Sequence, residues 1–178
     1  MGRVTLRRAA PDDVVWFDLW DTDSDVIACS SDDPAATVAF ADTDWAVELA
    51  AQDEYSEYFV AELDGRPIGA MQICDPHREP THYWGDIEPN LRAIDIWIGT
   101  GADRGQGYGT AMMRLALEIS FADSRVTGIV IDPLASNTRA HRFYERLGFE
   151  PTGRRRFGDD DCLVHELTRE GWRNRRSL

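Results

Sequence analysis

The chain has 178 residues, which suits one well-cored domain and falls short of two ordinary ones. Its 19 basic residues against 32 acidic residues give a net charge of −13, and every basic residue is arginine. The absence of lysine excludes a Walker-type phosphate loop, a pyridoxal Schiff base and a lysine general base, because each needs the ammonium group. The strong negative charge argues against nucleic acid as a partner, because that affinity depends on neutralised phosphates.

Other sequence features bear on compartment and metal content. Apolar runs are no longer than four residues, far below the roughly 20 of a membrane helix, so we expect no membrane partner. No apolar signal region opens the sequence, and Cys29, Cys74 and Cys162 form no CxxC pair. These features predict reduced thiols in a cytoplasmic protein. Cys74, His77 and His82 match no zinc spacing, so we expect no metal.

The charge is distributed unevenly along the chain. Residues 1–90 hold 20 carboxylates and five arginines, whereas residues 91–178 hold 12 carboxylates and 14 arginines. Between Arg8 and Arg66 there are 16 carboxylates and no arginine at all. The acidic half is either a solvated surface that favours solubility or a field that attracts a cationic ligand, and charge alone leaves both interpretations open.

Hydrophobic periodicity predicts the elements of the first half. Asp64–Gly65 between two alternating runs indicates a hairpin turn with positive φ. The polar segment that follows is a long loop, and structured loops of this length often bind ligands. In chain order we expect a strand over 4–7, a helix over 14–20 that starts at 11–13, a helix or broken pair over 35–51, strands over 58–63 and 67–74, and a loop over 75–89.

The second half continues with alternating strands and helices. Ser136–Asn137 can cap a helix, and Gly148 is a good stop signal. The expected elements are a strand over 91–98, a glycine-rich stretch over 99–109, a helix over 110–121, a strand over 126–131, a helix that ends before 148, and strands near 149–156 and 162–167. The order β-α-α-β-β-β-α-β-α-β-β predicts an α/β protein, a mixed sheet with helices on its faces.

The strongest motif is the strand-to-helix passage Arg104-Gly105-Gln106-Gly107-Tyr108-Gly109-Thr110. Its glycines let the backbone approach a ligand, and the N–H groups that open the helix form a natural anion site. The spacing differs from the GxGxxG dinucleotide fingerprint, and no early βαβ unit precedes it. The residues fit the narrower pattern R/Q-x-x-G-x-G/A.

That pattern resembles the one with which the GNAT superfamily of acyl-CoA-dependent N-acyltransferases wraps the coenzyme A pyrophosphate. A second motif, Asn137-x-x-Ala140-x-x-x-Tyr144-x-x-x-Gly148-Phe149, stands where that family has it. The resemblance implies a single GNAT domain over 1–178, with a core of about 4–167 and a basic tail over 168–178. It implies acetyl-CoA as the acyl donor, held by Trp97, Ile98, Arg104, Gly105, Gln106, Gly107, Tyr108, Gly109, Thr110 and Asn137.

A closer likeness lies within the superfamily. The segments 92–95, 105–110, 131–137 and 144–149 look like those of bacterial aminoglycoside 6′-N-acetyltransferases. Those enzymes have a carboxylate in the fourth strand, another after the fifth strand, and a loop with tryptophan and acidic residues before the fourth strand. The likeness implies acceptor binding by Trp84, Asp86, Glu88, Asp95 and Asp132.

The chemistry assigns roles to some of these residues. An amine must lose a proton before it attacks a thioester, and the departing thiolate should gain one. The resemblance implies Tyr144 as the acid, with a packed helix aromatic as the alternative. Asp95 lies opposite the isoleucines of its strand, so it is either the base, directly or through a water, or a structural carboxylate. Asp132 and Glu88 hold ammonium groups, unless Asp132 only ends a strand, and Trp84 is either a stacking wall or part of the loop's packing.

The resemblance therefore implies direct acetyl transfer from acetyl-CoA to a primary amine of a polycationic small molecule, with the 6′-amine of an aminoglycoside as the leading substrate. Grouped carboxylates are costly to bury unless a cation joins them, which suits such an acceptor. The alternatives are another GNAT substrate (a siderophore hydroxylamine, a polyamine or a protein N-terminus) and a non-catalytic acyl-CoA sensor. A monomer and a homodimer fit the sequence equally well.

Overall fold

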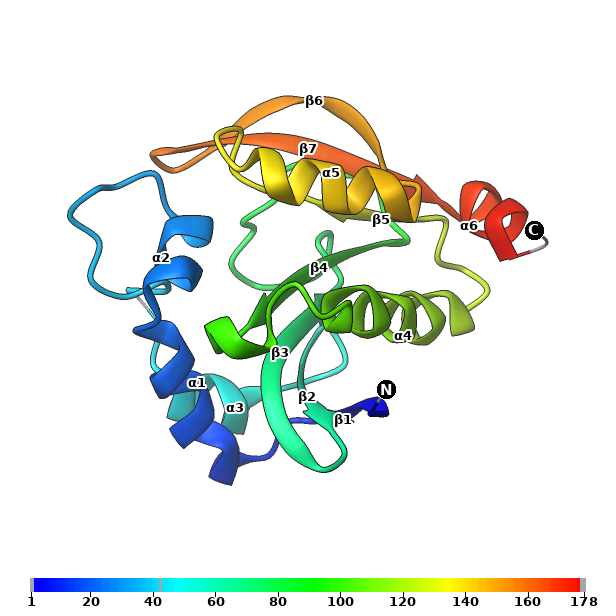
Figure 1. The fold of residues 1–178 in the computed structure, drawn as a ribbon. Coiled ribbons are helices and arrows are strands. Elements are labelled where there is room, and N and C mark those ends of the chain that lie inside the picture. The colour runs from blue at the N-terminus through cyan, green and yellow to red at the C-terminus, as the bar shows by residue number, and fades with distance from the viewer. Residues whose placement is uncertain (1, 42, 177–178) are drawn as a thin grey trace.

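Seven strands form one mixed sheet in the order β1-β2-β3-β4-β5-β7-β6, seen in a computed structural model that describes residues 2–41 and 43–176 (Figure 1). Neighbouring strands are antiparallel except for β4 and β5, which are parallel. All seven strands match predicted ones. They are β1 (Val4–Arg8), β2 (Ser56–Leu63), β3 (Arg66–Cys74), β4 (Leu91–Ile98), β5 (Gly128–Ile131), β6 (Glu150–Phe157) and β7 (Asp160–Thr168).

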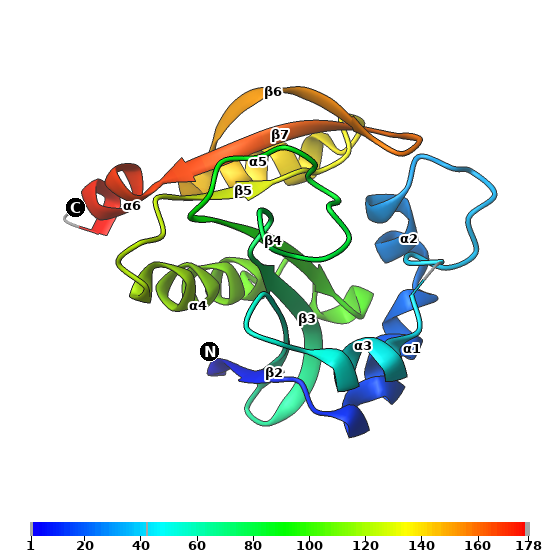
Figure 2. The same cartoon turned by 180° about the vertical axis from the view of Figure 1, so that it is seen from behind.

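Helices cover both faces of the sheet. The α-helices are α1 (Val14–Asp21), α2 (Ser24–Ser30), α3 (Trp45–Ala51), α4 (Tyr108–Ala122), α5 (Thr138–Leu147) and α6 (Arg169–Arg176), and two 3₁₀ turns are η1 (Pro11–Asp13) and η2 (Gly101–Asp103). None of these helices in the described ranges has the length and apolar character needed to cross a membrane. Figure 2 shows the loop between β3 and β4 on the face away from α4 and α5.

Strands β4 and β5 pair only at their beginnings. Three register pairs join them, from Leu91 with Gly128 to Ala93 with Val130. Beyond Ala93, β4 continues to Ile98 beside β3 alone, while the other edge of β5 pairs with β7. The sheet therefore opens between β4 and β5, and Figure 1 shows β1–β4 with α4 diverging from β5–β7 with α5.

Three buried clusters fix the two halves on either side of this opening. The largest lies under α4 and α5 and includes Ile94 and Tyr144. A second, aromatic cluster packs α1 and α3 on the other face, where Trp97 lies 5.1 Å from Phe40 between ring centroids. A third lies under the loop between β3 and β4 and includes Trp84. Alternation along β4 therefore sends Ile94 and Trp97 to opposite faces, as expected for a strand covered on both sides.

The hairpin turn and two helices agree well with the sequence. Asp64 and Gly65 have φ values of 51° and 85°, as a turn with two left-handed central residues requires. Helix α5 is capped by Asn137, whose Oδ1 accepts from the N–H of Ala140 at 3.0 Å. Gly148 ends it with φ 99°. These signals act within a few residues of each other, so local sequence is enough to place them.

Two helical expectations in the first half were wrong. Helix α2 was not predicted, although Asp23 caps it by accepting the N–H groups of Asp25 and Val26. Most of the helix or broken pair of helices expected over 35–51 is absent, and only α3 forms there, capped by Asp44. The reason is tertiary: Asp21 accepts the N–H groups of Ala39 and Phe40 through its carbonyl and carboxylate oxygens, which holds residues 35–41 in turns.

The expected basic tail is instead helix α6, anchored by Arg169. Its guanidinium donates to the carbonyl oxygens of Val126 at 2.6 Å and Phe121 at 3.1 Å, and also to that of Asp123. Trp172 stacks on Phe121, with 4.6 Å between ring centroids. Arg169 thus satisfies carbonyls at the end of α4, where a helix leaves them without partners.

We expect Arg169→Ala to lower the free energy of unfolding by about 1.5–3 kcal/mol, because three carbonyls lose a charged donor. Arg125→Ala is the matched control, since its guanidinium is 78% exposed and pairs with Asp123. We expect that control to change stability by less than about 1 kcal/mol. Urea unfolding of both variants measures the difference, and equal losses would contradict an anchoring role for Arg169.

Candidate active site

The residues predicted for catalysis meet at the opening between β4 and β5. Asp95 lies on β4 beyond its last pair with β5, and Asp132 directly follows β5. Tyr144 lies on α5, which packs on β7 through the stacked rings of His141 and His165. Because Tyr144 belongs to the cluster under α4 and α5 while Asp95 alternates to the other face, they approach the opening from opposite sides of the sheet.

Asp95 is reached by solvent yet surrounded by protein. Its side chain is exposed where β4 has no partner in β5. On the other side of β4 it pairs in register with Gln72 of β3, whose side-chain amide donates to the hydroxyl of Tyr58. Poor solvation, with a further contribution from the negative charge of Asp132, raises the pKa of Asp95 to about 7. A carboxylate that is half ionised near neutral pH is well suited to accept a proton from an ammonium group.

Asp132 has a neutral hydrogen-bond donor. The hydroxyl of Tyr83 donates to its Oδ2 at 2.7 Å. Burial raises the pKa of Asp132, and the hydrogen bond from Tyr83 opposes that shift. Tyr83 was not among the predicted site residues. The only signal for it in the sequence is an aromatic residue beside Trp84, and nothing there says which of the two rings faces outward.

The neighbouring Trp84 is buried. It is 4% exposed and packs edge-on against Phe157, with 5.0 Å between ring centroids. Of its two predicted roles, the structure shows loop packing, because the ring lies inside the third cluster and away from solvent. Asp86 and Glu88 are exposed, and their carboxylates are available to a cation in solution.

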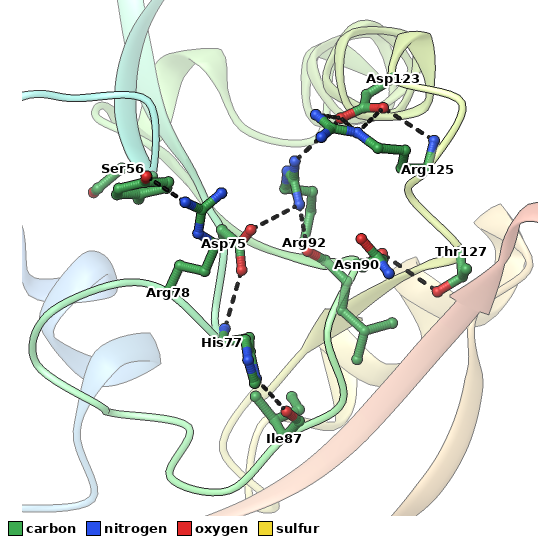
Figure 3. A network of polar contacts seen from close by, with 12 residues as sticks. Ser56, Asp75, His77, Arg78, Ile87, Asn90, Arg92, Asp123, Arg125 and Thr127 are labelled. Carbon is green, nitrogen blue, oxygen red and sulfur yellow. Dashed lines mark hydrogen bonds and ion pairs between the residues drawn. The ribbon is translucent and has the colours of Figure 1, made fainter.

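Ion pairs fix the base of this loop (Figure 3). Asp75 accepts from the N–H of His77 at 3.1 Å and from Arg92 at 3.3 Å. Arg92 in turn lies 3.7 Å from Asp123 at the end of α4. The Nδ1 of His77 bonds the carbonyl of Ile87 at 2.8 Å, which ties the two ends of the loop together. The loop therefore has a defined conformation, although it contains no helix or strand.

Tyr144 combines a packed ring with a hydroxyl that has no protein partner. The residue is 8% exposed, and its ring contacts Phe143, Phe149 and His165. Among the described residues none hydrogen-bonds its hydroxyl, and this oxygen is not sealed from solvent. Burial and the charges of Asp95 and Asp132 raise the pKa of Tyr144, so the phenol is protonated at neutral pH and can donate a proton.

The glycine-rich loop presents unpaired backbone donors at the start of α4. Gly105 and Gly107 have φ values of 73° and 84°, which turn the chain sharply into the helix. Within 2–41 and 43–176, no acceptor bonds the N–H groups of residues 105–110. The carboxylate of Asp103, just before the loop, accepts hydrogen bonds from the Arg66 guanidinium at 2.7 Å and from the Thr100 hydroxyl at 2.8 Å, which fixes the start of the loop. Such a set of donors is suited to an anion.

The side chains of several predicted coenzyme residues are engaged elsewhere. The guanidinium of Arg104 bonds the carbonyl of Ile98 at 2.9 Å and forms ion pairs with Asp23 and Asp25 of α2. Trp97 is 8% exposed in the aromatic cluster. The Oδ1 of Asn137 caps α5. The backbone polar groups of Trp97 face β3, where this residue pairs in register with Ala70, so neither its ring nor its backbone is directed into the opening. Arg104 joins the loop to α2.

The backbone of β4 also faces the opening. Asn90 accepts from Thr127 on the β5 side at 2.8 Å, and Gly99 donates to Ile68 on the β3 side at 2.9 Å. Because successive residues of a strand direct their polar groups to alternate sides, those of Ile94 and Ile96 point toward β5, where the pairing has ended. The opening thus offers strand donors and acceptors as well as helix N–H groups.

Residues 10–157 match the acetyltransferase (GNAT) domain family, so the chain belongs to the GNAT acetyltransferases. It is 30% identical over 177 residues to the "Aminoglycoside N(6′)-acetyltransferase type 1" of Klebsiella pneumoniae, covering 98% of this chain and 88% of that one. It is 35% identical to a "Kanamycin resistance protein" of Rhizobium radiobacter over 100 residues, 56% of this chain and 93% of that one.

A solved structure has the same fold. The crystal structure of the aminoglycoside acetyltransferase AAC(6′)-Ib with coenzyme A and kanamycin superposes with a TM-score of 0.81 at 28% identity, over 98% of this chain and 99% of that one. The family and the mixed-sheet fold predicted from the sequence are therefore confirmed.

Proposed function

We propose that this protein transfers the acetyl group of acetyl-CoA to a primary amine of an aminoglycoside, and that this amine is the 6′-amine. One observation carries the proposal: a protonated phenol and two carboxylates that form no ion pair among the described residues lie at one opening in the sheet, on opposite faces. The name of the Klebsiella relative and the kanamycin bound to AAC(6′)-Ib support the choice of acceptor.

The residues present fit coenzyme A on the α4 side of the opening. The unpaired N–H groups of residues 105–110 suit a pyrophosphate, and no atom lies within 4 Å of where a Cβ on Gly105 would stand. The polar backbone groups of β4 suit the amides of the pantetheine arm. When bound, acetyl-CoA supplies a thioester whose carbonyl carbon accepts the amine. Ile98, through its backbone, and Asn137 remain proposed contacts, whereas Trp97 does not, because its ring is buried and its backbone groups face β3.

On the other face, Asp132 holds the acceptor as its ammonium form and Asp95 takes one proton from the reacting nitrogen. The free amine then forms the new C–N bond, the C–S bond breaks, and the Tyr144 hydroxyl gives a proton to the departing sulfur. The nitrogen loses its second proton as the amide forms, which restores the Tyr144 phenol, and Asp95 releases the first proton to solvent. Substrate and product thus balance as amine plus thioester to amide plus thiol. No covalent intermediate on the protein is needed, because both substrates meet directly in the opening.

An acidic cavity beside the site supports a polycationic acceptor. It has a volume of about 490 Å³, and its lining includes Asp32, Asp33, Asp159 and Asp160. Phe157 links it to the site, since this ring lines the cavity and stacks under Tyr83. Unpaired carboxylates favour a cation strongly when several lie together. Asp86 and Glu88, exposed on the loop, are proposed to add to this field.

Thiol release from acetyl-CoA with a panel of amines tests the proposal. We expect turnover with kanamycin-type aminoglycosides at values of kcat/KM well above those for spermidine or a peptide N-terminus. Turnover with the polyamine or the peptide alone would overturn the choice of acceptor. Calorimetric binding of coenzyme A without turnover of any amine would indicate an acyl-CoA sensor.

The proposed compartment is the cytoplasm, and the three free cysteines support it.

Salt dependence provides a separate prediction about the acidic field. We expect KM for an aminoglycoside to rise several-fold between about 0.05 and 0.5 M salt, because salt ions screen attraction between exposed charges that lie farther apart than the Debye length, about 10 Å at 0.1 M and shorter at higher salt. The maximal rate should change little, since Asp95 and Tyr144 act at short range. An acceptor with fewer amino groups is the control and should show a shallower slope. Equal slopes for both acceptors would contradict attraction by the field.

A further inference from the structure

Tyr83 is a large exposed aromatic residue whose ring and hydroxyl are both engaged. It is 52% exposed, and its ring lies flat on Phe157, with 4.6 Å between centroids and 8° between planes. Its hydroxyl donates to Asp132 at 2.7 Å. One face of the ring is therefore covered, the other is open to solvent, and the polar end reaches the carboxylate at the mouth of the site.

The loop between β3 and β4 is built to hold Tyr83 there. Glu79 is 6% exposed, and its carboxylate accepts the N–H groups of Thr81 and Tyr83, each at 2.7 Å. Arg155 bonds the carbonyl of Trp84 and lies 4.9 Å from the ring of Phe157. A buried carboxylate is costly unless it is well bonded, and the N–H groups it satisfies here fix the backbone at Tyr83.

The choice of a phenol at Asp132 is unusual within this protein. Arginine pairs with seven other aspartates, Asp13, Asp23, Asp25, Asp75, Asp103, Asp123 and Asp161. Others, such as Asp21 and Asp160, accept from backbone N–H groups or a serine hydroxyl. Within the described residues, Asp132 has no arginine at ion-pair distance. A neutral donor orients a carboxylate without cancelling its charge, and the second oxygen keeps lone pairs for another donor. Asp132 is thus oriented and still available to a cation.

We propose that Tyr83 is the residue that positions Asp132 for the acceptor amine, and that its open ring face selects acceptors whose amine is carried on a saturated ring. The proposal rests on the proposed function and deepens it. An amino sugar offers both partners at once, an ammonium group for Asp132 and an apolar ring face for Tyr83. A linear polyamine offers only the first, because its flexible chain has no ring to lay on the phenol.

Tyr83→Phe tests the hydroxyl while keeping the ring on Phe157. We expect KM for a kanamycin-type acceptor to rise about 5–20-fold with kcat nearly unchanged, since a hydrogen bond to a charged group is lost. The limb of kcat/KM that reports ionisation of Asp132, separate from the Asp95 limb near 7, should move to higher pH, because Asp132 loses the donor that favours its ionised form. The other charges that face Asp132 stay in place: Asp95 on β4, Arg155 on β6 and Asp160 on β7.

Tyr83→Leu tests the ring. The preference for kanamycin over spermidine is measured as the ratio of the two kcat/KM values. We expect this ratio to be at least several-fold lower in Tyr83→Leu than in Tyr83→Phe. Tyr55→Phe is the matched control, because that hydroxyl also has a partner, Arg78, but lies outside the site. It should leave every parameter unchanged. Thermal unfolding of each variant shows whether the loop remains folded, which the conservative Tyr83→Phe change preserves.

The outcomes separate this inference from the proposed function. A wild-type protein that acetylates kanamycin, with a Tyr83→Phe variant of the same KM and pH profile, overturns the role of Tyr83 alone. A loss of kcat at constant KM also overturns it, because the hydroxyl would then act in the chemical step. A wild-type protein that acetylates no aminoglycoside overturns both.

Discussion

Tyr144→Phe is expected to lower kcat by about 10²–10⁴-fold, the range for loss of a general acid. The ring stays packed among Phe143, Phe149 and His165, so the fold should be retained. Affinity for acetyl-CoA should change by less than about threefold, because the hydroxyl acts on the sulfur only as it departs. Steady-state kinetics and calorimetric titration of coenzyme A separate the two effects.

The control for this substitution is Tyr55→Phe, which removes a phenol hydroxyl outside the site. Its turnover should equal that of the wild type. If Tyr144→Phe also keeps its turnover, Tyr144 is only a packed aromatic of α5 and the acid is another group or water. A leaving group of lower basicity than the coenzyme thiolate should partly restore the rate of Tyr144→Phe, since it needs no proton from the protein.

Asp95→Asn is expected to lower kcat/KM by about 10²–10⁴-fold above neutral pH, because the amide cannot accept the proton of the ammonium group. In the wild type, kcat/KM should rise with pH through about 7, as Asp95 ionises. The variant should lose that rise. A pH profile with an unchanged limb near 7 in Asp95→Asn would show that another group is the base.

The same substitution has a consequence for stability, with a definite sign. The pKa of Asp95 is raised in the folded protein, so the folded state binds more protons than the unfolded state between about pH 4 and 7. Its contribution to stability is present below that range and is lost as pH rises through about 7. Asp95→Asn should therefore be more stable than the wild type at pH 8, which thermal unfolding can measure. Equal stability at pH 8 would show that Asp95 is well solvated.

Local signals in the sequence were sufficient where neighbouring residues decide the structure. The Asp64–Gly65 turn, the cap at Asn137 and the glycines before α4 each act over a few positions, and all three are where they were predicted. The placement of Asp95 opposite Ile94 follows from alternation along β4 alone. Together with the motifs over 104–110 and 137–149, these signals were enough to predict the fold and the strands and helices that carry the site residues.

Residues whose position depends on distant partners were harder to predict. Arg104 pairs with Asp23 and Asp25, about 80 positions away in the chain, so a motif cannot show that its guanidinium is engaged. Tyr83 and Trp84 are adjacent, and their sequence does not say which ring is buried. Their different contacts with Phe157 decide it: Trp84 packs against the edge of that ring inside the protein, and Tyr83 stacks on its face and stays exposed.

The acidic half of the chain also has a more specific meaning in the structure. Asp13, Asp23 and Asp25 are paired with arginine, so they contribute little to an open field. Asp32 and Asp33 line the acidic cavity together with Asp159, in the turn between β6 and β7, and Asp160 at the start of β7. Of the two interpretations of the charge, the attraction of a cation therefore depends on a few residues, and the rest maintain the fold.

The most direct measurement is the product formed from kanamycin and acetyl-CoA by the purified wild-type protein, analysed by mass spectrometry and NMR. We predict that kanamycin gains one acetyl group, on the 6′-amine, at a rate that Tyr144→Phe and Asp95→Asn each reduce by at least about 100-fold. Kanamycin that stays unmodified, under conditions where the protein consumes acetyl-CoA with another amine, would contradict the proposed acceptor.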